Sequence, residues 1–272
     1  MFRIGCVPFL NAKPLIAYFG TEEGKSLAQV LLAPPSQLAR RVETGDVNVA
    51  LASSFFALES SDFKAVNGIA IASQGEVQSV RLFSKVPFDT IETLALDQAS
   101  MTSNHLCRII LNETYGAHPI CRALPAHLPS MLAEADAAVL IGDAGMSANG
   151  DGLYVLDLGE AWFDLTSLPF VWALWIGLDG LTDDLAMLLG RAKRFGLENI
   201  ELVAATEAER LGWPLSTCRS YLVEAMDYGF GLSHVEGLRR FGEYCVELGF
   251  IGRLKMPDLV GEASPTLPTS SR

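Results

Sequence analysis

The sequence has few basic residues, and this scarcity narrows the classes of partner that the protein can bind. Its 272 residues include 20 Lys and Arg against 32 Asp and Glu, so the formal net charge is −12 at pH 7. Nucleic acids and anionic membranes are bound by basic faces, and neither is expected as a partner here. A small anionic ligand is still compatible with this charge, because local dipoles and one or two cations can outweigh distant charges.

Metal-binding and cofactor-binding motifs are also missing. The five cysteines are scattered and never spaced C-x-x-C, and the four histidines form no H-E-x-x-H pattern. There is no G-x-G-x-x-G, Walker-type or G-x-S-x-G motif, so we expect no metal, no cofactor and no serine-hydrolase chemistry. Scattered cysteines without a pairing pattern fit a reducing compartment.

Long hydrophobic runs are absent as well. The longest, at residues 168–178, is far shorter than the ~18 residues that cross a bilayer. Residues 1–14 lack the continuous apolar core of a signal peptide. We therefore expect a cytoplasmic protein.

Half of the residues are apolar, and they recur as short strands that alternate with helices. Strands are predicted at residues 2–7, 28–32, 46–51, 94–96 and 137–141. This order of strand and helix is typical of an α/β protein with a parallel sheet covered on both faces. From residue 181 onward the pattern becomes helical, and its clearest helix is predicted at 234–248.

The predicted elements divide into two lobes. Residues 1–87 have few helices of their own and the helices of 177–272 need a partner surface, so these segments are expected to form one lobe. Residues 88–176 are expected to form the second lobe, closed by the apolar run at 166–176. Two such lobes with two crossovers leave a ligand cleft lined by the carboxyl ends of strands from both.

Polar turns follow four of the predicted strands and supply the candidate site residues. A helix that begins just beyond a strand directs N–H groups and the positive end of its dipole into the cleft, which suits a carboxylate or phosphate. Each polar side chain could instead only cap its helix, but four turns of one type favour a shared anion site. The turns contain Asn11, Ser53, Ser54, Ser100, Thr102, Ser103, Gly142 and Asp143.

Three other polar residues lie near the predicted cleft. Arg81 and Arg108 are the nearest cations, although either could pair with surface acids. His105 comes early in the helix that follows residues 94–96, so it could face the cleft or lie on the surface.

Six sequence blocks in order resemble the menaquinone-biosynthesis family typified by chorismate dehydratase. They are RIGCVPFLNAKPL, DVNVALASSFFAL, SVRLFSKVP, LALDQASMTSNHLCRIIL, ADAAVLIGDAGM and SLPFVWALW. The resemblance spans about residues 2–250, and it implies a two-lobed fold like that of type II periplasmic binding proteins. The motif LNAKP at residues 10–14 points to the dehydratase branch rather than to the related naphthoate-synthase branch.

The resemblance implies a lyase that removes water from chorismate to give 3-[(1-carboxyvinyl)oxy]benzoate. Residues 102–103 would hold one substrate carboxylate, and residues 53–54 would hold the opposite end of the molecule. Asn11 would orient the leaving hydroxyl or an anionic group, while Asp143 caps or assists. Because His and Glu are scarce in the turns, the substrate's own carboxylate could take the proton.

Three departures from the family pattern lie near the predicted cleft. Residues 8–9 are Pro-Phe where Ser-Tyr is common, residues 104–105 are Asn-His where small apolar residues are usual, and Ser167 replaces a common glycine. They mark either a paralogue with another ligand or ordinary drift. Two other functions stay open: a cytoplasmic anion-binding or sensor protein without catalysis, and a related naphthoate-synthase-type lyase.

Overall fold

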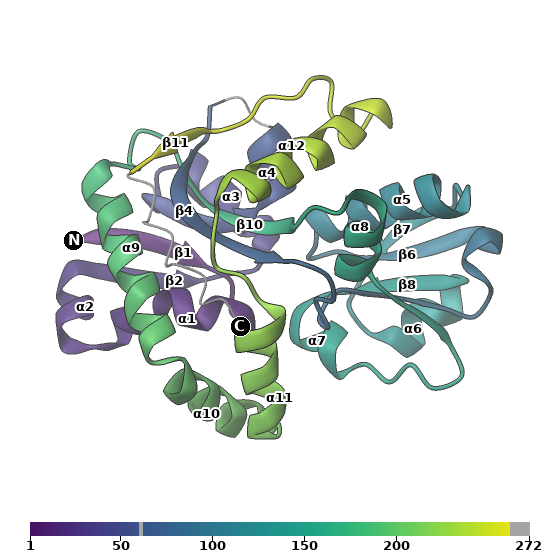
Figure 1. The fold of residues 1–272 in the computed structure, drawn as a ribbon, viewed down its shortest axis with the longest axis horizontal. Helices are drawn as coiled ribbons and strands as arrows, with labels where there is room; N and C mark the ends of the chain where they lie inside the picture. Colours follow the sequence, from purple (N-terminus) through teal and green to yellow (C-terminus); the bar gives the residue numbers. More distant parts are fainter. Residues whose placement is uncertain (60–61, 262–272) are drawn as a thin grey trace.

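The computed structural model describes residues 1–59 and 62–261 and contains two β-sheets (Figure 1). The larger sheet has the strand order β11-β4-β10-β3-β1-β2, and the smaller has the order β7-β6-β8-β5-β9. The strands are β1 (Phe2–Cys6), β2 (Ala28–Leu32), β3 (Val49–Ser53), β4 (Lys64–Ser73), β5 (Arg81–Ser84), β6 (Thr93–Asp97), β7 (Ile120–Leu124), β8 (Ala137–Leu140), β9 (Tyr154–Asp157), β10 (Phe170–Gly177) and β11 (Asp258–Val260).

Helices alternate with most strands and dominate after β10, as the sequence pattern predicted, but the short strand β11 near the end of the described residues was not predicted. They are α1 (Lys13–Ile16), α2 (Glu22–Leu27), α3 (Pro35–Glu43), α4 (Ser54–Glu59), α5 (Thr102–Tyr115), α6 (Leu128–Glu134), α7 (Gly142–Ser147), α8 (Leu158–Thr166), α9 (Asp183–Glu198), α10 (Ile200–Leu211), α11 (Leu215–Ser220) and α12 (Leu232–Glu247). Short 3₁₀ turns lie at Leu10–Ala12, Ala17–Gly20 and Phe88–Thr90, and a π-helical turn spans Tyr221–Ala225. None of the helices in the described residues is long and apolar enough to cross a bilayer.

Both sheets are mixed, with parallel pairs at their centre or edge and antiparallel pairs around the strands β10 and β5, where the chain passes between sheets. β1 pairs in parallel with β2 and β3, and β6 pairs in parallel with β7 and β8. β10 is antiparallel to β3 and β4, and β5 is antiparallel to β8 and β9. A strand that enters from the other sheet approaches from the opposite direction, so it runs against its new neighbours.

These pairings divide the chain at points that differ from the predicted lobe boundaries of 87 and 177. β5, expected in the first lobe, lies in the smaller sheet, and β10, expected to close the second lobe, lies in the larger sheet. Both are crossover strands whose apolar composition suits either sheet, so composition alone does not assign them. We therefore propose that the larger lobe contains residues 1–73 and 170–261 and that the smaller sheet spans 81–157.

The carboxylate of Asp157 holds both crossovers together. It caps α8 by accepting the N–H groups of Gly159 (2.9 Å) and Glu160 (3.1 Å). It also accepts the N–H groups of Val77 (3.0 Å) and Gln78 (2.7 Å) from the other crossover. Burial raises the pKa of Asp157, while these four bonds act to lower it. One buried acceptor therefore fixes the place where the chain leaves and re-enters the larger lobe.

An aromatic cluster packs the second crossover against the larger lobe. Trp162 of α8 meets Phe170 of β10 edge-to-face at 5.2 Å between ring centroids, and Phe170 meets Phe241 of α12 at 5.1 Å. All three side chains are at most 1% exposed. Such contacts add to the stabilisation from burial itself. The cluster therefore limits how α8 can move relative to β10 and α12.

Candidate functional site

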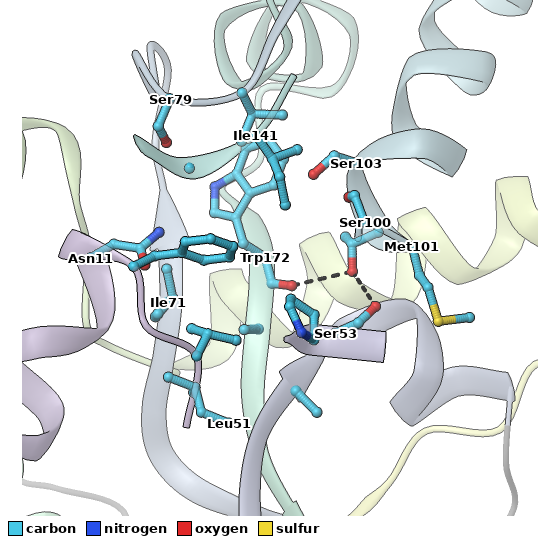
Figure 2. Close-up of a pocket in the computed structure, with 18 of the residues that line it drawn as sticks. Asn11, Leu51, Ser53, Ile71, Ser79, Ser100, Met101, Ser103, Ile141 and Trp172 are labelled. Carbon is cyan, nitrogen blue, oxygen red and sulfur yellow. Dashed lines mark hydrogen bonds between the residues drawn. The ribbon is translucent and has the colours of Figure 1, made fainter. Parts of the chain in front are cut away.

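A hollow lies between the two sheets where several strands end (Figure 2). It holds about 590 Å³ of atom-free space, part of it open to solvent, which is within the range of small-molecule sites. Its walls come from the ends of β1, β3 and β8, the start of α5, both crossovers and β10. The lining residues are Val7, Phe9, Asn11, Pro35, Leu51, Ala52, Ser53, Ile71, Val77, Ser79, Val80, Ser100, Met101, Thr102, Ser103, Ile141, Gly142, Trp172 and Ala173.

The lining residues carry no charged side chain. Phe9 and Trp172 supply aromatic walls, while the polar groups are one amide and several hydroxyls. Low-charge surroundings of this kind hold an anion through neutral donors, namely O–H groups and the N–H groups at a helix start. Across the described residues, no three His, Cys, Asp or Glu side chains are grouped to hold a metal ion.

The Thr102 hydroxyl joins the larger lobe to the start of α5. Its Oγ1 lies 2.6 Å from Ser53 Oγ and donates to the Trp172 carbonyl at 3.2 Å (Figure 2). It also accepts the N–H of Phe55 at 3.3 Å. The structure thus brings Ser53 and Thr102 together from two lobes. Because these partners occupy the Thr102 hydroxyl, it holds the lobes together and has little capacity left for a ligand.

The Ser54 side chain does not reach the hollow. Ser54 is fully buried, and its hydroxyl donates to the Val171 carbonyl at 2.6 Å. The Ser54 side chain lies on the inner face of α4. Ser54 is the first residue of that helix, whereas Ser53 is the last residue of β3. The sequence pattern grouped the two serines, but only Ser53 lines the hollow.

The hydroxyls at the start of α5 do not cap the helix, so the capping role that the sequence also allowed does not apply to them. Met101 is the N-cap residue, and no side chain caps the helix. The first helical bond runs from the N–H of His105 to the Met101 carbonyl (3.2 Å), so the N–H groups before it have no acceptor within the helix. Ser100 and Ser103 line the hollow beside these N–H groups.

Asn104 closes the turn that carries these serines. Its Nδ2 donates to the carbonyls of Asp97 (2.9 Å) and Ser100 (2.6 Å). This departure from the family pattern therefore has a structural role at the edge of the hollow, where it fixes the path of the chain from β6 into α5.

Gly142 and Asp143 have different roles at the start of α7. Gly142 lines the hollow with a φ of +57°, and a Cβ there would lie 3.0 Å from the Phe9 ring, so both the backbone conformation and the space favour glycine. The Asp143 side chain is not part of the lining and does not cap α7. Its carboxylate accepts the N–H of Leu10 at 3.2 Å. Burial raises the pKa of Asp143, and the bond from Leu10 opposes this shift.

Asn11, next to Leu10, projects from the loop that Asp143 holds. Its Oδ1 is buried and has no hydrogen-bond partner among the described residues. Ser79 lies on the same side of the hollow (Figure 2) and is only 1% exposed. Its Oγ accepts a hydrogen bond from Tyr221 at 2.8 Å. The sequence pattern did not indicate Ser79 or Tyr221, because Ser79 lies in a crossover rather than in a strand-to-helix turn.

The two arginines expected near the cleft are used elsewhere. Arg81 donates to the carbonyls of Gly145 (2.9 Å) and Ala148 (3.0 Å) at the end of α7. The Arg108 guanidinium lies 4.0 Å from the centre of the Phe250 ring. Neither arginine lines the hollow, although each lies within a few sequence positions of a residue that does.

A second hollow adjoins the first and does contain a cation. It holds about 480 Å³ of atom-free space, part of it open to solvent. Pro35, Ser53 and Met101 line both hollows, so the two are continuous around these side chains. The other residues of the second hollow are Ala39, Arg40, Glu43 and Phe56.

His105 lies on the face of α5 that packs against α4, and it does not line the hollow. Its ring stacks on Phe55 at 3.7 Å between centroids, and its Nδ1 lies 2.8 Å from the Met101 carbonyl. Burial lowers the pKa of His105 to about 4. The imidazole is therefore neutral near pH 7 and supports the α4–α5 contact.

This buried imidazole predicts a stability component that depends on pH. In the unfolded chain His105 takes up a proton near pH ~6.5, whereas in the folded protein its pKa is about 4. Stability should therefore fall as the pH drops through this window, by up to about 3 kcal/mol from this residue. His105→Phe should lose less stability than the wild type between about pH 7 and pH 4.5 in urea unfolding. His118→Gln, at an exposed position, is the control and should behave like the wild type. An equal loss of unfolding free energy in the wild type and in His105→Phe would contradict the role given to His105.

Comparison with known proteins places this geometry in context. Residues 2–247 match the family model described as "Menaquinone biosynthesis". The chain is 31% identical over 231 residues to a chorismate dehydratase from Thermus thermophilus, covering 78% of this chain and 83% of the relative.

Solved structures resemble the fold at lower identity. A protein from Archaeoglobus fulgidus has a TM-score of 0.73 at 17% identity and covers 92% of this chain and 98% of its own. The periplasmic aliphatic sulphonate binding protein SsuA from Escherichia coli has a TM-score of 0.63 at 13% identity, covering 100% and 97%. The chain thus has the predicted two-lobed α/β architecture of the periplasmic-binding-protein type.

Proposed function

The chain belongs to the menaquinone biosynthesis family, and on this premise we propose that it is a chorismate dehydratase. It would convert chorismate to 3-[(1-carboxyvinyl)oxy]benzoate and water. The observation that carries the proposal is the match to the Thermus thermophilus chorismate dehydratase over most of both chains. A hollow between two lobes, lined by hydroxyls and aromatic rings, supports it.

The proposed reaction makes modest demands on the protein. The C3–H electron pair becomes the new C3–C4 double bond, the C4–O bond breaks, and the hydroxide leaves with the proton as water. The ring becomes aromatic, so the step is strongly downhill and needs no electron acceptor. Positioning and limited acid–base assistance are sufficient.

The neutral donors of the hollow suit a substrate with two carboxylates. We assign one carboxylate to Ser103, Ser100 and the free N–H groups at the start of α5. Ser53 would contact the opposite end, and Asn11 and Ser79 would face the leaving hydroxyl. Asp143 would assist indirectly by holding the loop that carries Asn11. The absence of His, Asp and Glu from the lining supports the substrate's own carboxylate as the proton acceptor.

A cytoplasmic location is also part of the proposal. It is supported by the cysteines, since all five are free in the structure. Free thiols persist in reducing compartments.

Incubation of the purified protein with chorismate tests the function directly. We expect an aromatic product with the mass of chorismate less one water, visible by mass spectrometry and ultraviolet absorption. Binding of chorismate without product would favour the anion-sensor alternative. No binding and no product would contradict the proposal.

Replacement of Asn11 tests its proposed role at the leaving hydroxyl. Asn11→Ala should lower kcat by more than about tenfold, because one oriented hydrogen bond in the transition state is lost. Thermal melting should show that the fold is intact. Asn112→Ala, on the outer part of α5, is the matched control and should keep the wild-type rate. A near-normal rate for Asn11→Ala would remove this residue from the mechanism.

Arg40 is the cation best placed to meet the second carboxylate, because it lines the hollow that adjoins Ser53. Arg40→Gln should raise the KM for chorismate by about tenfold, since a hydrogen bond between charged groups is worth roughly 1.5–3 kcal/mol. Arg41→Gln, the next residue on α3, changes the net charge equally and serves as the control. An unchanged KM for chorismate in Arg40→Gln would exclude the contact between Arg40 and the second carboxylate.

Glu43 lines the same hollow. Glu43→Gln should therefore lower the KM for chorismate slightly.

A further inference from the structure

Tyr221 lies outside the hollow, yet its hydroxyl is hydrogen-bonded to Ser79, which lines the hollow. It is the first residue of the π-helical turn Tyr221–Ala225, which follows α11 directly. The bond from the Met226 N–H to the Tyr221 carbonyl (3.1 Å) closes this wide turn. Single π turns interrupt regular helices at an energetic cost and are frequent at functional sites. The Tyr221 side chain is only 1% exposed, so its hydroxyl needs partners within the protein.

The partners of this hydroxyl fix its direction. Its hydrogen is donated to Ser79 Oγ at 2.8 Å. The Leu10–Ala12 turn that carries Asn11 packs against the π-helical turn that begins at Tyr221, and the Asn11 side chain acts to lower the pKa of Tyr221, as a donor to the phenol oxygen does. Because the single hydrogen of the phenol points to Ser79, only its lone pairs remain for Asn11. The Asn11 amide must therefore donate through Nδ2.

This arrangement determines what Asn11 and Ser79 present to the hollow. With Nδ2 turned to Tyr221, the Asn11 Oδ1 is left as a free acceptor, consistent with its being buried without a partner. The Ser79 oxygen accepts from Tyr221, so the Ser79 hydrogen remains free to be donated elsewhere. An acceptor and a donor thus lie on one side of the hollow (Figure 2).

We propose that Tyr221 is a positioning residue that orients the Asn11 amide as an acceptor and the Ser79 hydroxyl as a donor toward one hydroxyl of the ligand. The inference rests on the proposed dehydration of chorismate. The leaving hydroxyl would donate its hydrogen to Asn11 Oδ1 and accept a hydrogen from Ser79 as the C4–O bond lengthens. Negative charge grows on that oxygen during departure, so a fixed donor there favours the transition state more than the ground state.

Tyr221→Phe tests this role, because it removes the hydroxyl while keeping the buried ring. We expect kcat for chorismate to fall by about tenfold and KM to change by less than about twofold. Tyr228→Phe is the matched control: Tyr228 is 5% exposed, and its hydroxyl has no hydrogen-bond partner among the described residues. It should keep the wild-type kcat.

A double-mutant cycle separates positioning from a general structural effect. If Tyr221 acts through Asn11, Tyr221→Phe should have little further effect in the Asn11→Ala background. A full, additive loss in that background, or a wild-type kcat for Tyr221→Phe, would overturn the inference. Thermal melting of each variant excludes partial unfolding as the cause. A wild-type protein that forms no product from chorismate would instead refute the proposed function, and this inference with it.

Discussion

The hydroxyl of Thr102 is the contact on which the geometry of the site depends. Its oxygen is hydrogen-bonded to the Ser53 hydroxyl and accepts the N–H of Phe55, both from the larger lobe. Its hydrogen is donated to the carbonyl of Trp172 in β10. Polar groups buried this deeply are costly when unpaired, so this set of bonds favours one relative position of α5 and the β3–α4 turn. That position brings the donors at the start of α5 opposite Asn11 and Ser79.

The negative net charge of the protein does not extend to the lining of the hollow. The net charge of −12 belongs to the whole chain, whereas the lining of the hollow is uncharged. Hydroxyls and helix N–H groups can hold an anion without cationic side chains, because they are already oriented and need little reorganisation. Arg81, which was expected near the site, instead stabilises the fold at the end of α7.

One departure from the family pattern has a conformational explanation. Ser167 ends α8 with a φ of +57°, in the left-handed region that glycine adopts without strain. The glycine common at this position is therefore favoured by the turn between α8 and β10 rather than by the ligand. Phe9 differs in this respect, since its ring lines the hollow and packs against Gly142.

The sequence by itself determined the alternation of strands and helices, the α/β class and the polar turns at Asn11, Ser53, Ser100, Ser103 and Gly142, because apolar periodicity and turn residues are local properties. It did not determine β4, the sheets of β5 and β10, or which turn side chains face inward. Only the tertiary structure decided that the Thr102 and Ser54 hydroxyls bond within the protein, that Arg81 and Arg108 lie outside the hollow, and that Ser79 meets Tyr221. Those outcomes depend on contacts between residues up to 142 positions apart, and no local pattern encodes such contacts.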